Sequence, residues 1–212
     1  KCTVFAQEKG YYGDFYRKVL IERPIVSVAR SRYELMYQTY YAWFTNAEDR
    51  VSVAPIAAPG TFEAPRAYRL RQGHQTALDL FFMSVTKEAN EEIGPSLFSH
   101  TSGIVIAAAN GWDENVYDIQ GGLSPHSGNG VVVYDPFAER YYFYFHLHDI
   151  VVYPGQIIRA GALIGHGGNT GINARKPNKG EHVHVEIYDC RKNEFFNVYE
   201  IKEILYDRYY RQ

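Results

Sequence analysis

Two His-x-His sequences are the first candidates for chemistry: His146-Leu-His148 and His182-Val-His184. Side chains two positions apart on a β-strand project from the same face, so each pair would present two imidazoles together. Neutral imidazole is a common protein ligand for zinc. The pattern therefore predicts a metal or proton-transfer site, although an isolated His-x-His is also compatible with two exposed histidines on a polar strand face.

A third segment places a histidine and a carboxylate close together, in Gly73-His-Gln-Thr-Ala-Leu-Asp79. Zinc hydrolases commonly use three protein ligands and keep a fourth position for water, whose pKa falls to about 7 on the metal. His74, Asp79 and one histidine of the 182–184 pair would supply such ligands. His146 and the other histidine of that pair would move protons.

These side chains need a scaffold, and the chain supplies short apolar runs separated by Gly- and Asn-rich segments. Such spacing predicts a mostly antiparallel β core. Residues 84–95 are polar and are predicted to be an insertion or a short helix. A helical stripe over 197–210 predicts a C-terminal helix, and a rougher stripe over 28–50 predicts an N-terminal one. The runs predicted as strands cover residues 78–83, 103–109, 130–135, 140–148 and 182–188.

An ordered series of motifs gives these features a family context. From residues 146 to 186 the chain resembles the lysostaphin/LytM-type zinc endopeptidases, which are peptidoglycan hydrolases. The resemblance covers about residues 70–190 and implies the mostly antiparallel β-sheet core of that family. Its motifs are His146-Leu, Val152-Tyr-Pro-Gly-Gln156, Ala160-Gly161, Ile164-Gly165, Gly168-Asn-Thr-Gly171 and His182-Val-His-Val-Glu186.

The resemblance also assigns roles. Asp79 and His184 match the family's metal ligands, and His146 and His182 match its catalytic histidines. The first ligand histidine of the family lies four positions before the aspartate. Here His74 lies five positions before Asp79, and Gln75 occupies the fourth, so either residue could hold that position. An intact site with His74 is the favoured reading.

Two further residues are candidates for substrate binding. Strand alternation predicts that Tyr142 and Tyr144 share a face with His146, where Tyr144 would line a groove or donate a hydrogen bond to a tetrahedral intermediate. The alternative is that aromatic residues simply favour strands. Asn169 lies in the family's Gly-Asn-Thr-Gly turn and would contact substrate, the alternative being turn chemistry alone.

The resemblance implies a function and a domain division. Residues 1–60 are expected to form an N-terminal helical and loop extension, and residues 61–212 a LytM-like metallopeptidase domain with a C-terminal helix. The expected activity is Zn²⁺-dependent hydrolysis of peptide cross-links in bacterial peptidoglycan, with peptidoglycan peptide stems as partners. The alternative is a catalytically degenerate LytM-like domain that binds cell wall or regulates a partner hydrolase.

Composition restricts the other possibilities. The formal net charge of -2 in 212 residues argues against a nucleic-acid-binding protein, which usually has a basic excess. No apolar run approaches the roughly 20 residues that a transmembrane helix needs. A start at Lys1 without methionine favours an exported protein, periplasmic or secreted. The only cysteines, Cys2 and Cys190, are either two unrelated thiols or one bridge formed in an oxidising compartment.

Overall fold

A computed structural model describes Pro55 and residues 69–82, 86–88, 91–113, 121–177 and 179–210. The helical extension predicted within residues 1–60 lies, apart from Pro55, outside these described residues. The same holds for the domain boundary predicted at residue 60.

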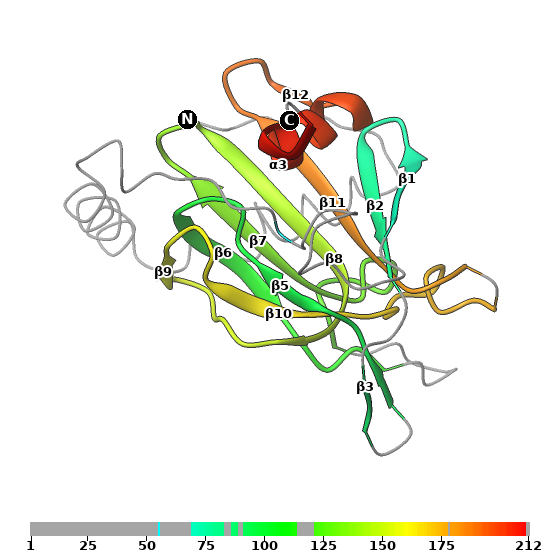
Figure 1. Ribbon diagram of the computed structural model, residues 1–212. Helices are drawn as coiled ribbons and strands as arrows, with labels where there is room; N and C mark the ends of the chain where they lie inside the picture. Colours follow the sequence, from blue (N-terminus) through cyan, green and yellow to red (C-terminus); the bar gives the residue numbers. More distant parts are fainter. Residues whose placement is uncertain are drawn as a thin grey trace.

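One large sheet dominates the described part of the chain, and its pairings are antiparallel (Figure 1). The mostly β, antiparallel fold expected from the sequence is confirmed, and each of the five predicted strand runs corresponds to a strand. The main path runs in the order β1 (Arg69–His74), β2 (Ala77–Phe81), β11 (His182–Asp189), β8 (Arg140–Ile150), β7 (Asn129–Asp135), β6 (Gly103–Ala109), β9 (Ile157–Ile158).

Shorter strands extend this sheet. β10 (Leu163–Gly167) pairs with both β8 and β5 (Ser96–Phe98), and β12 (Glu194–Phe195) pairs with the end of β11. β3 (Thr86–Glu88) and β4 (Glu91–Ile93) form a separate two-stranded hairpin. A short helix over residues 84–95 was one of the two predicted alternatives, and it is wrong, because the backbone groups of this polar segment pair across a hairpin instead.

The predicted C-terminal helix is α3 (Val198–Tyr210). It begins at a capping box: the Asn197 side chain accepts hydrogen bonds from the backbone N–H groups of Tyr199 and Glu200, and the Glu200 carboxylate accepts one from the Asn197 N–H. Its buried residues Ile201 and Leu205 join the core cluster on one face of the sheet.

The alternation of side chains divides the sheet into two faces with different functions. The face beneath α3 is hydrophobic, and β2 and β11 contribute Leu78, Leu80, Val183 and Val185 to it. Asp79, Phe81, His182 and His184 occupy the alternate positions of the same two strands, β2 and β11. They therefore point to the opposite face, which carries the candidate site.

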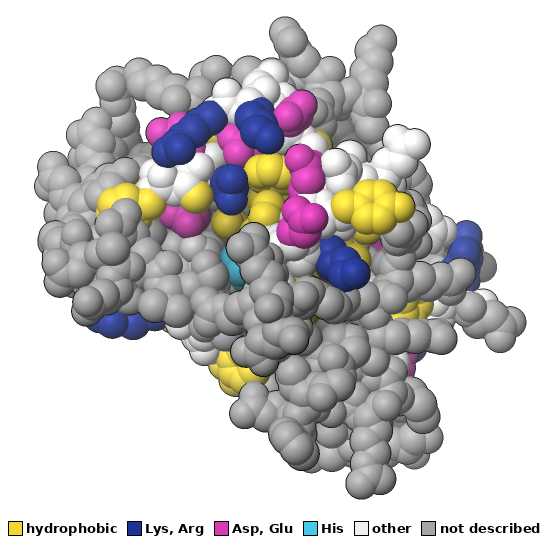
Figure 2. Space-filling model, turned by 45° about the horizontal axis from the view of Figure 1, so that its top comes forward, with side chains coloured by type: hydrophobic (Ala, Val, Ile, Leu, Met, Phe, Trp, Pro, Cys, Tyr) yellow, Lys and Arg dark blue, Asp and Glu magenta, His cyan; other side chains and the backbone are white. Residues whose placement is uncertain are grey.

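One face of the molecular surface carries side chains of both charges. Figure 2 looks onto the side of α3 and β12, where basic and acidic side chains lie interspersed with hydrophobic ones. This mixture agrees with the nearly neutral sequence. Among the described residues, no helix is long and apolar enough to cross a membrane.

Candidate metal and catalytic site

A buried carboxylate–imidazole–carboxylate chain forms one half of the site. Asp79 on β2 and His184 on β11 are cross-strand partners, and Asp79 Oδ1 lies 2.9 Å from His184 Nδ1. Glu186, two residues further along β11, places Oε1 3.0 Å from His184 Nε2. All three residues are buried, His184 to 1% exposure. Each nitrogen of the His184 ring therefore faces a carboxylate, and this fixes the orientation of the ring.

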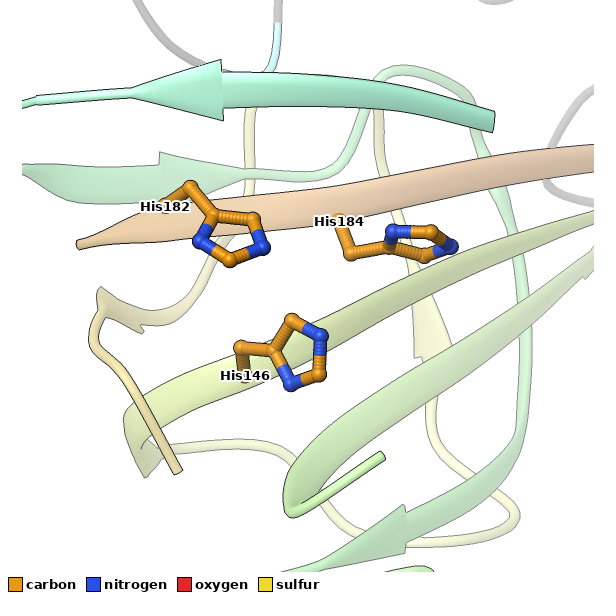
Figure 3. Close-up of side chains that lie close together, drawn as sticks. All are labelled: His146, His182 and His184. Atoms are coloured by element: carbon orange, nitrogen blue, oxygen red, sulfur yellow. The ribbon is translucent and has the colours of Figure 1, made fainter. Parts of the chain in front are cut away.

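Two more imidazoles complete the site, His146 from β8 and His182 from β11, and the three rings face a common space (Figure 3). His146 Nδ1 lies 2.7 Å from the Thr170 carbonyl oxygen, and His182 Nδ1 lies 2.9 Å from that of Gly180. A carbonyl oxygen only accepts, so Nδ1 donates in both rings. In the neutral form, each ring then carries its lone pair on Nε2.

The position of His146 depends on a β-bulge. In the pairing of β7 with β8, Asn129 is opposite Leu147 and Gly130 is opposite Phe145, so His146 is the extra residue. Its φ angle is 64°, in the left-handed region that few non-glycine residues adopt. Such backbone strain, of order 1–3 kcal/mol, persists only where the surroundings enforce it, and it often marks functional sites.

The surroundings of His146 hold the bulge in place. The Thr170 hydroxyl donates to the Leu147 carbonyl oxygen at 2.8 Å and accepts from the Asn129 backbone N–H at 2.9 Å. Gly171 approaches so closely that an added Cβ would lie 3.0 Å from His146 Nδ1 and 2.3 Å from the His126 carbonyl oxygen. Only glycine fits here, which gives the Gly-Asn-Thr-Gly turn a structural function.

Burial controls the charge of His146. Desolvation lowers the pKa of His146 well below its usual value, and the neighbouring His182 and His184 lower it further. Aromatic rings back the site: Phe81 stacks on His182 at 4.9 Å between centroids, and Phe145 lies parallel to His184 at 6.0 Å. His146 is therefore a neutral base at neutral pH, in surroundings of low polarity.

The side chains suit a zinc ion. Two donors on one tetrahedral zinc, with bonds of 2.0–2.2 Å, lie roughly 3.3–3.6 Å apart. The 2.9 Å between Asp79 Oδ1 and His184 Nδ1 needs only a small opening to reach this distance. The three histidines also form a candidate group, with ligand atoms within 4.8 Å of one another.

The structure shows where His74 and Gln75, the two candidates for the first metal ligand, lie relative to Asp79. Residues 75 and 76 form the turn between β1 and β2, so neither candidate lies on the strand of Asp79. His74 is paired with Ala77 across an irregularity in the ladder, and Arg71 is the residue opposite Asp79. Gln75 is exposed. His74 therefore belongs to the strand paired with that of Asp79, and Gln75 belongs to the turn that joins the two strands.

Tyr144 lies on the face of the sheet opposite to the three histidines of the site. It is fully buried in the cluster beneath α3, and its hydroxyl accepts a hydrogen bond from the His100 backbone N–H at 3.2 Å. Tyr144 and Leu147 belong to the same cluster although they are three positions apart. The prediction that Tyr144 shares a face with His146 is wrong, because the bulge interrupts the alternation.

Asn169 stays beside the site. It precedes Thr170 and is half-buried, and its side-chain oxygen accepts a hydrogen bond from Arg175 at 3.2 Å. The sequence motifs assigned no role to Glu186. The signal for it was its position on the face of His182 and His184, two residues further along the predicted strand.

Comparison with known proteins gives a family. The model of Peptidase family M23 matches residues 91–197. This range contains His146, His182, His184 and Glu186, and it begins after Asp79. No curated protein matches the chain.

Solved structures are similar at low identity. The catalytic domain of the antimicrobial peptidase lysostaphin from Staphylococcus simulans is 19% identical, over 68% of this chain and 80% of that one, with a TM-score of 0.39. A zinc-containing peptidase from Vibrio cholerae is 19% identical over 71% of this chain and 40% of its own, with a TM-score of 0.45. The lytM protein of Ruminococcus gnavus is 17% identical over 96% and 85%, with a TM-score of 0.49.

Proposed function

Because the chain belongs to peptidase family M23, we propose that it is a zinc-dependent endopeptidase that hydrolyses peptide cross-links of bacterial peptidoglycan. The observation that carries the proposal is the buried contact between Asp79 and His184, with His146 and His182 beside it. The motif series from His146 to Glu186, which resembles the lysostaphin/LytM-type enzymes, supports the choice of cell wall as substrate.

Three residues are the proposed zinc ligands. Asp79 Oδ1 and His184 Nδ1 already face each other. Glu186 faces His184 Nε2, so with zinc on Nδ1 it would accept the Nε2–H of that ring. His74 is the proposed third ligand, from the neighbouring strand β1, opposite a position two residues before Asp79.

His146 and His182 are the proposed catalytic residues. Bound zinc would polarise the scissile carbonyl and make water acidic enough to supply hydroxide near neutral pH. A neutral Nε2 on either ring accepts the proton of the attacking water and later returns it to the leaving amine. The carbonyl oxygens of Thr170 and Gly180 keep the Nδ1–H of each ring engaged and stabilise the imidazolium that forms.

The disulfide supports a location outside the cytoplasm. Cys190 follows β11 and is disulfide-bonded; Cys2, the only other cysteine in the sequence, lies outside the described residues. Disulfides form and persist mainly in oxidising compartments. We therefore propose a periplasmic or secreted protein.

The test combines metal content with cleavage. The purified protein, supplied with zinc and dialysed, should contain one zinc per chain by mass spectrometry. It should release cross-linked muropeptides, and a chelator should abolish that release. His182→Ala should retain zinc but lose cleavage. Absence of bound zinc would contradict the proposal. Wall binding with zinc but without turnover would favour the degenerate, binding-only alternative.

A pair of variants decides the third ligand. If His74 binds zinc, His74→Ala should reduce the bound zinc well below one per chain, whereas Gln75→Ala, which changes an exposed turn residue, should retain it. The opposite result would assign the position to Gln75. Equal retention in both would show that neither residue is a ligand.

A further inference from the structure

The part of β8 that carries His146 contains two irregularities close together. In the pairing of β8 with β7, His146 is the extra residue. In its pairing with β10, consecutive residues of β10 are opposite Leu147 and Asp149, so His148 is the extra residue. Extra residues fall outside the regular ladder of backbone hydrogen bonds. Other contacts must therefore fix the chain over 146–148, and with it the position of the His146 ring.

A single residue, Asn129 at the start of β7, holds both carbonyl groups that follow His146. Its side-chain Nδ2 donates to the His148 carbonyl oxygen at 2.9 Å. Its backbone N–H donates to the Thr170 hydroxyl at 2.9 Å, and that hydroxyl donates to the Leu147 carbonyl oxygen at 2.8 Å. These bonds replace the ladder at the point where it is interrupted.

The Asn129 amide has one orientation that satisfies its neighbours. Its Oδ1 accepts the Trp112 backbone N–H at 2.9 Å, while its Nδ2 donates to the carbonyl oxygen of His148. A backbone N–H only donates and a carbonyl oxygen only accepts, so turning the amide over would lose both bonds. Asn129 is 3% exposed. A buried amide that is engaged at both ends is a rigid connection between the loop of Trp112 and β8.

The same segments also bind the backbone and the ring of His146. The Ser127 carbonyl oxygen, two residues before Asn129, accepts the His146 backbone N–H at 3.0 Å. The Thr170 carbonyl oxygen accepts the hydrogen bond of His146 Nδ1 at 2.7 Å. A shift of β8 relative to Asn129 would therefore change the direction in which His146 Nε2 points.

We propose that Asn129 is a positioning residue for His146. Its side chain fixes the bulge, so that His146 Nε2 keeps its direction toward the space shared with His182 and His184 (Figure 3). It acts through the backbone of β8. The inference rests on the proposed function, because it treats His146 as a catalytic residue, and it adds a residue that turnover requires and zinc binding does not.

Asn129→Asp is the main variant, because it keeps the shape and the Oδ1 acceptor but removes the Nδ2 donor. By mass spectrometry the chain should still contain one zinc. With purified cross-linked muropeptides as substrate, KM should stay unchanged and kcat should fall about 10- to 100-fold, the loss expected when a catalytic group is displaced by up to about 1 Å. Asn129→Ala removes both side-chain bonds without adding a charge and should show the same separation of kcat from KM.

Proton NMR of the metal-free protein gives a second measurement, which does not depend on cleavage. The buried Nδ1–H of His146, bonded to the Thr170 carbonyl oxygen, should give a downfield resonance in slow exchange with water. Its loss in His146→Gln assigns it. In Asn129→Asp the resonance should move upfield and exchange faster, because the ring no longer keeps its hydrogen bond to Thr170.

Asn193→Asp is the matched control. It makes the same chemical change in the exposed turn that follows β11, where Asn193 Oδ1 accepts the Tyr188 hydroxyl at 2.6 Å. A carboxylate oxygen accepts that bond equally well. This variant should leave the zinc content, kcat and the His146 resonance unchanged.

Several results would overturn the inference. An unchanged kcat, an unchanged His146 resonance or a loss of zinc in folded Asn129→Asp would each do so. Loss of folding in both Asn129 variants, measured by thermal unfolding, would assign Asn129 to the fold rather than to His146. If the unmodified protein cleaves nothing, the proposed function fails, and the resonance alone then decides whether Asn129 positions His146.

Discussion

Glu186 controls the metal site through an imidazole rather than through the metal itself. It lies 3.0 Å from His184 Nε2 and is 4% exposed. Removing such an outer carboxylate typically costs 10–100-fold in metal affinity. Glu186→Ala should therefore weaken zinc binding by about 10- to 100-fold, measured by competition with a chromophoric chelator. Glu186→Gln should lose less, because its side-chain oxygen still accepts the Nε2–H.

The control for this prediction is Glu194→Ala, an exposed carboxylate on β12. It should bind zinc like the unmodified protein. Thermal unfolding of the metal-free proteins separates a positioning role from general damage to the fold. Unchanged zinc affinity in a folded Glu186→Ala protein would show that Glu186 does not position His184.

The lowered pKa of His146 predicts an acid sensitivity of the metal-free protein. Below about pH 6.5 the unfolded chain takes up a proton at this residue, whereas the folded protein does not. The folded state then binds fewer protons, so the free energy of unfolding falls as the pH falls, by at most about 1.4 kcal/mol per pH unit from this group.

Urea unfolding in the presence of a chelator tests this sign. Between about pH 7 and pH 5, His146→Gln should show a shallower loss of stability than the unmodified protein, because the variant has no proton to take up at this position. The difference between the two slopes should disappear above about pH 7.5. Parallel slopes throughout would contradict a buried, neutral His146.

At the scale of elements, the alternation of side chains predicted the strands, but it did not predict the β-bulge at His146. The shared face of His182, His184 and Glu186 followed from a period of two. The extra residue at His146 did not, because its cause lies in the register with Asn129 and Gly130 on β7, which a local pattern does not contain. The same limit applied to residues 74–79, where a turn interrupts what looked like a continuous spacing.

The glycine turn after β10 is predicted to be essential for placing His146. Gly171 has φ of 105°, and a Cβ there would collide with the His126 carbonyl oxygen. Gly171→Ala should destabilise the protein by more than the roughly 1–2 kcal/mol that a left-handed alanine costs, and should also reduce turnover. The measurement is chemical unfolding together with peptide cleavage.

Gly111→Ala is the matched variant. Gly111 has φ of 76°, but an added Cβ would meet nothing within 4 Å. It should cost only the backbone term, about 1–2 kcal/mol, and should retain activity. Equal effects of the two substitutions would show that the close approach of Gly171 has no special function.

At the scale of the whole molecule, the disulfide at Cys190 is attached next to the strand that carries His182 and His184. The sequence left two isolated thiols and one bridge as equal alternatives. The prediction is that thiol titration of the non-reduced, denatured protein detects no free cysteine. Reduction should lower the free energy of unfolding by about 2–4 kcal/mol. Two titratable thiols in freshly purified, oxidised protein would contradict the bridge.

Local sequence patterns also could not predict the order of the strands in the sheet. β11 lies between β2 and β8, so residues from distant parts of the chain meet at one site. The sequence predicted these strands one by one, and only the resemblance connected them. Side-chain periodicity determines which face a residue occupies, whereas the choice of neighbouring strand depends on packing of the complete sheet.

The separation between Asp79 and His184, 105 positions along the chain, also determines when the site can exist. Contacts this distant in sequence slow folding, because a long loop must close before they form. An emerging or unfolded chain has neither the carboxylate nor the imidazole in place, so we expect zinc to bind after the sheet has closed rather than to guide its folding. The proposed hydrolytic activity would then be absent during synthesis, and it would begin only when β11 and its histidines have joined the sheet.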